Sequence, residues 1–111
     1  MLYTEILKDP AVFSKLYKKG KKTAGTGISA FYLSNKRPFN RFGITAGKKV
    51  GGAVERNRAK RIIRAAYRKN ELLLPLGYDI VFVARAEILE KKSTQLDGFF
   101  SRLSASMKKS V

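Results

Sequence analysis

One stretch of this sequence, residues 46–69, combines the densest positive charge with the clearest helical period, and it constrains the fold more than any other. Stepped at 100° per residue from about Ala53, it places a group of small and branched residues in one arc: Ala59, Ile62, Ile63 and Ala66. The adjoining arc is polar and basic: Asn57, Lys60, Arg61, Arg64 and Arg68. The pattern predicts a helix that packs on one face and binds a partner with the other.

The charge of this predicted helix indicates what that partner is. Like charges three or four residues apart, such as Lys60 and Arg64, each cost a few tenths of a kcal/mol in an isolated helix. A helix that is merely solvated would mix signs, but only Glu55 is acidic, in the first turn where the helix dipole favours it. The whole chain carries 24 Lys and Arg against 8 acids, a net charge of +16. A nucleic acid is therefore favoured over water as the partner of this face.

Length and composition bound the class of protein. A chain of 111 residues, 44% of them hydrophobic, is expected to form a single domain over residues 1–111 with a modest core. No run reaches the roughly 20 apolar residues of a membrane span, and the N-terminus lacks the pattern of a signal peptide, so we expect a cytoplasmic protein without a membrane partner. The absence of Cys and His removes the usual nucleophile, general base and zinc ligands.

The remaining chain predicts an alternation of helices and strands. Asp9, Pro10 and Gly20 are placed to begin and end a helix over residues 10–19. Residues 28–34 and 41–46 alternate like strands, and we expect them to form an antiparallel hairpin with a six-residue loop; a short strand near Lys22 precedes them. Residues 78–84 are apolar on both faces, like a central strand, and the intervening basic helix is long enough for a parallel crossover.

A closing amphipathic helix is expected after residue 93. Thr94 and Asp97 have the spacing of a capping box. The apolar positions that follow recur at helical spacing and are expected to be core: Leu96, Phe99, Phe100, Leu103 and Met107.

Two short motifs suggest nucleotide binding but fail on their context. The glycines at 25 and 27 match a dinucleotide fingerprint, yet a strand follows them where a helix is required. The glycines at 43 and 47 are too close for a P-loop, and Lys49 stands where Ser or Thr must reach a metal. Acids are sparse and unclustered, so we expect no catalytic residue and no metal site in the chain.

A known family has a signature that closely resembles this sequence. The family is the bacterial ribonuclease P protein component, and the run that carries the resemblance is Lys48-Lys49-Val50-Gly51-x-Ala53-Val54-x-Arg56-Asn57-Arg58-x-Lys60-Arg61-x-x-Arg64. Further matches flank it in the family's order: Phe13-x-x-Leu16-Tyr17-x-x-Gly20-Lys21 before, and Gly77-Tyr78-Asp79-Ile80-Val81 with Arg85 after. The resemblance covers nearly the whole chain.

The resemblance implies a fold and a function. The fold is an α+β sandwich of α-β-β-β-α-β-α topology, with a small mixed sheet and a left-handed β-α-β crossover. The function is that of the protein subunit of ribonuclease P, which binds the catalytic RNA and precursor tRNA and assists endonucleolytic removal of the 5′ leader. The catalytic centre is expected in the RNA with its Mg²⁺ ions, and no small-molecule substrate is implied.

The resemblance also assigns residues to two surfaces. The helix and its preceding loop would meet the ribonuclease P RNA through Lys48, Lys49, Arg56, Asn57, Arg58, Lys60, Arg61, Arg64 and Arg68. A cleft for the single-stranded leader would be formed by Phe13, Tyr17 and Tyr32, with Lys15, Lys18 and Lys21 beside the phosphates. Burial of all four apolar residues of the first helix is the plain alternative for Phe13 and Tyr17.

Three alternatives remain open from the sequence. Arg58 could pair with an internal carboxylate such as Asp79 instead of binding RNA. A ribosomal or other structured-RNA-binding protein without an enzyme would share the charge and the fold type. A stand-alone nuclease would need clustered acids, which the sequence lacks.

Overall fold

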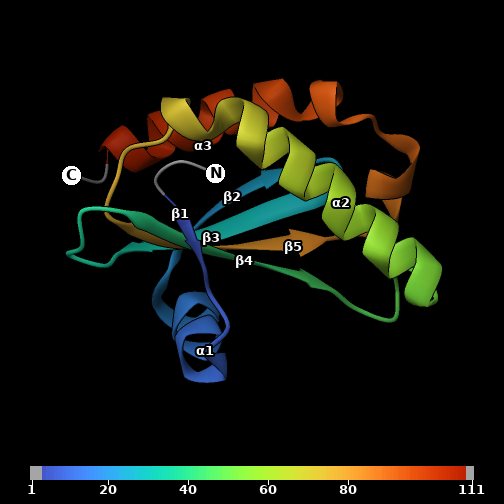
Figure 1. Cartoon of the computed structure of the whole chain (residues 1–111), viewed down its shortest axis with the longest axis horizontal. Coiled ribbons are helices and arrows are strands. Elements are labelled where there is room, and N and C mark those ends of the chain that lie inside the picture. Colours follow the sequence, from blue (N-terminus) through green and yellow to red (C-terminus); the bar gives the residue numbers. More distant parts are fainter. Residues whose placement is uncertain (1–3, 110–111) are drawn as a thin grey trace.

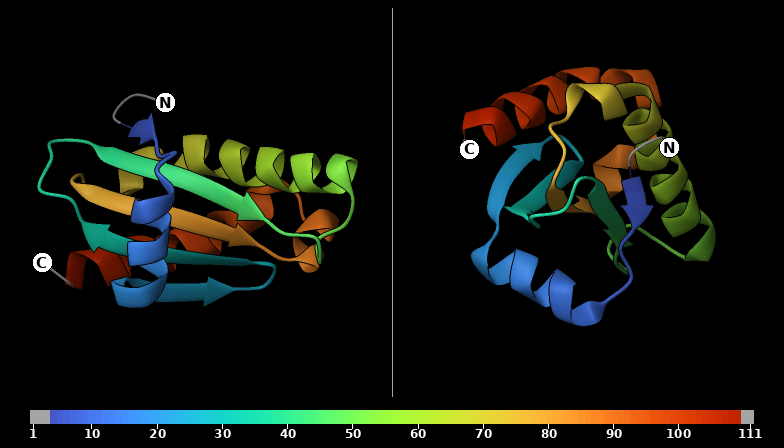
Figure 2. Two further views of the ribbon diagram at one scale, coloured as in Figure 1. Left: turned by 90° about the horizontal axis from the view of Figure 1, so that it is seen from below. Right: turned by 60° about the vertical axis from the view of Figure 1, so that its left-hand side comes forward.

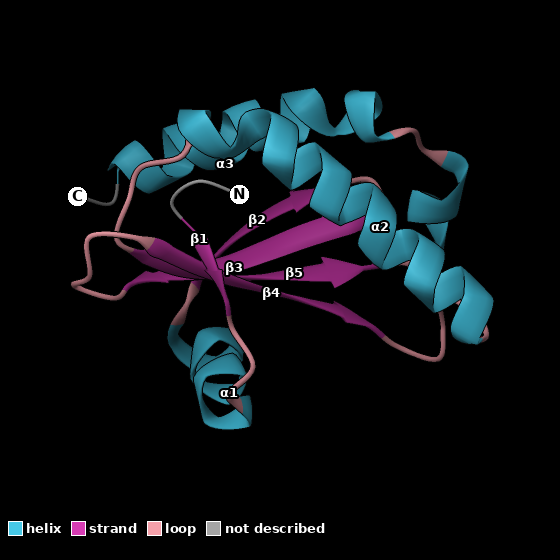
Figure 3. Cartoon of the chain, in the orientation of Figure 1, coloured by secondary structure: helices cyan, strands magenta, loops and turns pink. Residues whose placement is uncertain are grey.

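The computed structural model describes residues 4–109 as one mixed sheet with helices on both faces (Figures 1 and 3). The strands are β1 (Thr4–Ile6), β2 (Lys21–Gly25), β3 (Ile28–Ser34), β4 (Asn40–Ala46) and β5 (Tyr78–Ala84). The helices are α1 (Pro10–Lys19), α2 (Ala53–Asn70) and α3 (Asp97–Lys109), with short 3-10 turns η1 (Glu71–Leu73), η2 (Ala86–Glu90) and η3 (Ser93–Leu96). The expected α-β-β-β-α-β-α order is confirmed, preceded by the additional strand β1. None of the helices within this part of the chain is both long and apolar enough to cross a membrane.

The strand order in the sheet is β1-β4-β5-β3-β2. Helix α1 lies on one face, while α2 and α3 cover the other (Figure 1). β5 is central because both of its faces are apolar: Ile80 and Phe82 belong to the larger core under α2 and α3, and Val81 packs with Leu7 and Leu16 under α1. The interior position expected for residues 78–84 is confirmed.

The expected hairpin between residues 28–34 and 41–46 is wrong. β5 lies between these two strands and pairs antiparallel with β3 and parallel with β4. The loop between β3 and β4 therefore spans the start of β5, where the amide of Asn35 donates to the carbonyl of Gly77 at 2.8 Å. A strand that is apolar on both faces is most stable in the middle of the sheet, and here that preference overrides pairing between neighbours in sequence.

The connection from β4 through α2 to β5 joins two adjacent parallel strands. Figures 1 and 2 show that this crossover is left-handed, as the resemblance implied. Most β-α-β units are right-handed. The crossover lays α2 diagonally over the β4 side of the sheet, with its packing residues Ala59, Ile63 and Ala66 fully buried.

The start of α3 differs from expectation. Asp97 is the first residue of the helix, and its amide donates to the carbonyl of Thr94. Its carboxylate is not used in a capping box with Thr94 and instead accepts hydrogen bonds from Lys69 Nζ at 2.8 Å and Asn70 Nδ2 at 3.0 Å. The local turn before it is fixed instead by Gln95, whose Oε1 accepts from the amide of Lys92 at 2.7 Å. The expected stripe from Leu96 to Met107 is buried and is confirmed as core.

Candidate nucleic-acid interface

The basic helix α2 begins at a glycine cap. Gly52 has an extended backbone and its amide donates to Glu55 Oε1 at 2.8 Å, so the single acid of this helix is used to fix its first turn. Gly51, just before it, has a φ of +145°, and a Cβ there would meet the Glu55 side chain at 2.8 Å. The loop carrying Lys48 and Lys49 is therefore held against the helix start.

The basic face of α2, with that loop, comprises the nine residues expected to bind RNA. Arg56, Lys60 and Arg64 are partly buried beside the sheet, whereas the other six are exposed: Lys48, Lys49, Asn57, Arg58, Arg61 and Arg68. The two ion pairs found among residues 4–109 involve none of the nine. So many unneutralised cations on one surface favour a polyanionic partner.

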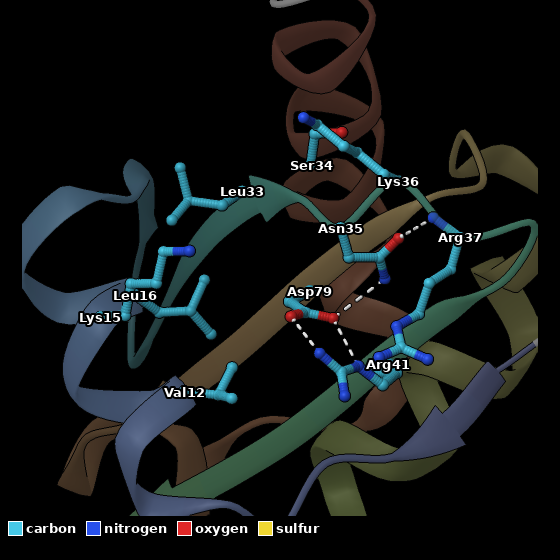
Figure 4. Close-up of a pocket in the computed structure, with 10 residues that line it drawn as sticks. All are labelled: Val12, Lys15, Leu16, Leu33, Ser34, Asn35, Lys36, Arg37, Arg41 and Asp79. Atoms are coloured by element: carbon cyan, nitrogen blue, oxygen red, sulfur yellow. Dashed lines mark hydrogen bonds and ion pairs between the residues drawn. The ribbon is translucent and has the colours of Figure 1, made fainter.

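Asp79 does not pair with Arg58, so that expectation is wrong. The helix α2 and the Asp79 side chain lie on opposite faces of the sheet, and Asp79 instead binds Arg41, its register partner on β4. Arg41 donates from Nε to Oδ1 at 2.8 Å and from Nη2 to Oδ2 at 2.7 Å, and Asn35 Nδ2 donates to Oδ1 at 2.9 Å (Figure 4). Burial opposes ionisation of this carboxyl, but the hydrogen bonds from Arg41 and Asn35 outweigh it and lower the pKa of Asp79. Arg58 remains free for a partner.

Helix α1 contacts the sheet with Leu16, which is 1% exposed, and leaves two flanks at the sheet surface. Phe13 and Tyr17 form the aromatic flank. Gly43 on β4 leaves space for the ring of Phe13, because a Cβ at residue 43 would lie 2.4 Å from Phe13 Cζ. Val12 and Lys15 belong to the opposite flank. Phe13 is partly buried and Tyr17 is 42% exposed, so the plain alternative of full burial is wrong for Tyr17.

Tyr17 is held in place by contacts to two strands. Its ring meets that of Phe31 on β3 at right angles, with 5.3 Å between centroids, and its hydroxyl lies 3.1 Å from Thr45 Oγ1 on β4. The ammonium of Lys22 on β2 lies 5.5 Å from the centre of the Phe31 ring. An aromatic pair with one exposed and one partly buried ring, and a cation beside it, can stack bases and neutralise phosphates.

Tyr32 is not part of this surface, and its assignment to the leader cleft is corrected here. It lies on the other face of the sheet, is 1% exposed, and its hydroxyl hydrogen-bonds to Ser106 on α3. Phe31, one residue earlier, occupies the place beside Tyr17. The alternation of β3 separates Phe31 from Tyr32 in the sequence already, but it does not tell which face α1 covers.

The three lysines expected beside the leader do not gather at one place. Lys18 is exposed on α1, Lys15 lies on the flank opposite Tyr17, and Lys21 is in register with Tyr32. Lys22, which was not expected there, contacts the aromatic pair through the Phe31 ring. The sequence indicates Lys22 only through the short strand predicted near it, whose ends the sequence does not define.

A hollow of about 270 Å³ connects the aromatic flank to α2. Phe13 and Gly43 line it from one side, and Lys60 and Arg64 line it from the other. The surface on α1 and the basic face of α2 are therefore continuous around the β4 edge of the sheet.

The side chains available to bind a metal ion are few. The chain has no His and no Cys, which leaves the carboxylates of Asp and Glu as the usual ligands. Within residues 4–109, these carboxylates do not come together in a group of three or more. The described chain offers no donor set that fits Mg²⁺.

Comparison with known proteins finds one family. The family model described as "Ribonuclease P" matches residues 1–108. The ribonuclease P protein component of Clostridioides difficile is 43% identical over 96 residues, which are 85% of this chain and 83% of that protein. That of Alkaliphilus metalliredigens is 34% identical over 102 residues, 92% of each chain.

Solved structures of similar fold come from the same kind of protein. The RNase P protein of Thermotoga maritima superposes with a TM-score of 0.79 at 26% identity, covering 92% of this chain and 96% of its own. The RNase P protein of Staphylococcus aureus superposes with a TM-score of 0.71 at 30% identity, covering 94% and 92%.

Proposed function

The chain belongs to the ribonuclease P protein family, and we propose that the basic face of α2 binds the ribonuclease P RNA while the aromatic flank of α1 holds the 5′ leader of precursor tRNA. Its role is that of the protein subunit of this endoribonuclease, which matures the 5′ ends of tRNA. The observation that carries the division of surfaces is the contact between the exposed Tyr17 ring and the partly buried Phe31 ring, on the face of the sheet that α1 covers.

RNA binding by α2 follows from its donors. Arginine presents a planar fork to phosphate oxygens, lysine presents a point charge, and an amide such as Asn57 can both donate and accept. The exposed members of the set, such as Arg61 and Arg68, reach a partner without changing the core. The partly buried Arg56, Lys60 and Arg64 have less rotamer freedom to lose on binding, which favours them as positioning contacts.

The leader surface suits single-stranded RNA of variable sequence. Bases stack on aromatic faces at roughly 1–3 kcal/mol each with little sequence preference. We assign stacking to Tyr17 and Phe31, with Phe13 beside them, and phosphate contacts to Lys22 and Lys18. Tyr32 is excluded by its burial.

We assign the cleavage step to the RNA of the holoenzyme and the Mg²⁺ that it binds. The protein lacks His and Cys, and its described part gathers no carboxylates that could hold the ion. Its residues would bind and orient the two RNAs, and its positive charge would reduce the repulsion between them.

Comparison of precursor and mature tRNA tests the leader assignment. In the reconstituted holoenzyme, Tyr17→Ala and Phe31→Ala should each weaken binding of precursor tRNA by about tenfold, within the range for one stacked base. Mature tRNA has no leader, so its affinity should stay unchanged. Leu73→Ala is the matched control, because Leu73 is 49% exposed but lies in η1, where its carbonyl accepts a hydrogen bond from Ser104 on α3.

Equal losses of affinity for precursor and mature tRNA would contradict the assignment. A loss of precursor affinity in Leu73→Ala as large as in Tyr17→Ala would also contradict it. Thermal unfolding of each variant separates lost binding from lost fold. A role in another structured-RNA complex, without an enzyme, is not favoured, since the relatives named above are ribonuclease P protein components.

A further inference from the structure

The second flank of α1 carries a pocket that the proposed function does not use. It measures about 360 Å³, within the range typical of small-ligand sites, and lies between α1, the end of β3, the loop after β3 and the starts of β4 and β5 (Figure 4). Neither Tyr17 nor Phe31 lines it. The side chains that matter here are Val12, Lys15, Leu33, Arg37, Arg41 and Asp79.

Arg41 is oriented inside this pocket before any ligand arrives. Asp79 takes two of its five N–H groups, from Nε and Nη2, and Asn35 holds Asp79 in turn. No other acceptor within residues 4–109 meets the remaining N–H groups of Arg41, whose side chain is 22% exposed. A guanidinium fixed in this way can bind an anion at little entropic cost.

Two further cations face the same space. Lys15 enters from α1, and Arg37 points from the loop toward Arg41 (Figure 4). Neither of these side chains has an ion pair among the described residues. The loop that carries Arg37 is itself fixed, because Asn35 Oδ1 accepts the Arg37 amide at 2.8 Å and Asn35 Nδ2 donates to the carbonyl of Phe39 at 3.2 Å. Lys15, Arg37 and Arg41 thus line the pocket together with one acid, Asp79, which is already hydrogen-bonded. Glu5, the register partner of Arg41 on β1, and Asp9 also act on Arg41 but do not line the pocket.

The opposite wall of the pocket is apolar. Val12 and Leu33 are partly buried hydrophobic residues that pack on the core under α1 and also line the pocket. A phosphate ion would bind the cations but make no contact with the apolar wall. An acidic peptide would bind the cations through flexible carboxylates, which also gain nothing from an apolar wall. A nucleotide presents both a dianionic phosphate and a flat, weakly polar base.

From this geometry we propose that the pocket between α1 and the β3–β4 loop is a second nucleotide-binding site. The phosphate binds Arg41, Arg37 and Lys15, and the base lies on Val12 and Leu33. The site would accept a phosphate-bearing nucleotide of single-stranded RNA on the flank of α1 that faces away from the leader surface. It does not depend on how the aromatic flank is used.

Titration of the full-length protein with small probes tests the site directly. Uridine 5′-monophosphate should shift the backbone amide NMR signals of Leu33, Ser34 and Arg37 in a saturable way. Uridine, which lacks the phosphate, should not. Inorganic phosphate should bind more weakly than the nucleotide and leave the signals of Val12 and Leu33 in place.

Charge variants separate a built site from general attraction to a basic protein. The double variant K15Q/R37Q should weaken uridine monophosphate binding by about tenfold, the factor that corresponds to about 1.4 kcal/mol and is typical of a lost charge-assisted contact. The matched control K108Q/K109Q removes the same charge from the exposed end of α3 and should change the affinity little. Tyr17→Ala should leave the shifts at Arg37 intact.

Three outcomes would overturn the proposal. Shifts confined to the aromatic flank or to α2 would show that the pocket stays empty. Equal affinity losses in K15Q/R37Q and K108Q/K109Q would show that net charge alone drives binding. Equal affinities for inorganic phosphate and the nucleotide would show that the apolar wall takes no part.

Discussion

At the scale of single residues, Asp79 joins three segments: β5, which carries it, β4 through Arg41, and the loop after β3 through Asn35. Its lowered pKa means that this carboxyl stabilises the folded state fully above its ordinary pKa of 3.8, and that the stabilisation is lost as the pH falls through the lower folded value. Below that pH the folded protein keeps Asp79 neutral, and the contribution disappears.

Asp79→Asn should therefore lower the free energy of unfolding at pH 7, by about 1–3 kcal/mol for the loss of hydrogen bonds to a charged group. The difference from the unsubstituted protein should shrink as the pH is lowered to 3 and below. Urea unfolding at both pH values measures this. Asp97→Asn removes a carboxyl that bonds Lys69 and Asn70 at an exposed site and should cost less. A difference that does not vary with pH would refute the assigned role.

Phe31 and Tyr32 show how far the sequence leads at this scale. Their alternation in a strand predicts that they face opposite sides of the sheet, and that is confirmed. Which of them meets α1 depends on the direction in which the chain leaves α1 and on where β5 inserts. Both depend on contacts between residues far apart in the sequence, so the wrong aromatic residue was assigned to the leader surface.

Among the elements, α2 was the most predictable because one local period encodes both its packing and its charge. Its start at Ala53 and its buried face were expected, although Tyr67 and Asn70, also buried, were not. Helix α1 and the central strand β5 were recognised for similar local reasons: caps for the first, and an apolar run for the second. The predicted hairpin between β3 and β4 is wrong because β5, which is more hydrophobic and comes later in the sequence, lies between them. Adjacency of two strands in the sequence does not reveal such an insertion.

The exposed position of Arg61 on α2 leads to a prediction about salt. Arg61→Ala should weaken binding to the ribonuclease P RNA and reduce the slope of log K against log salt by roughly 0.7–0.9, the value for one phosphate contact. The melting temperature should stay the same, since Arg61 is exposed. Binding isotherms at several salt concentrations, with Lys108→Ala as the control, give the slopes. An unchanged slope with a collapsed melting temperature would mean that Arg61 is structural.

At the scale of the whole molecule, positive charge and aromatic side chains occupy one continuous surface that runs from α1 around the edge of β4 to α2. The sequence predicted the charge but not the continuity, which arises from the left-handed crossover that lays α2 beside β4. Within residues 4–109, carboxylates do not gather in a group of three or more that could hold a catalytic metal ion.

The purified protein should therefore cleave no precursor tRNA when ribonuclease P RNA is absent. Added to that RNA, it should lower the Mg²⁺ concentration required for cleavage, because its cations replace part of the counterion charge between the two RNAs. Cleavage rates across a Mg²⁺ series, with and without protein, measure the shift. Spermidine at a matched concentration of charge is the control for general screening. Cleavage by RNA-free protein, or an unshifted Mg²⁺ series, would contradict this prediction.

The central place of β5 also governs the order in which the protein can fold during synthesis. Every strand that β5 touches is made earlier, so a nascent chain that ends before residue 78 holds β1 with β4, and β2 with β3, with no strand to join the two pairs. Neither pair alone has the number of strands needed for a stable sheet in water. We expect the ribosome-bound chain to stay unfolded until β5 has emerged, so folding begins only when about three-quarters of the polypeptide, including the whole of the basic helix, is already outside.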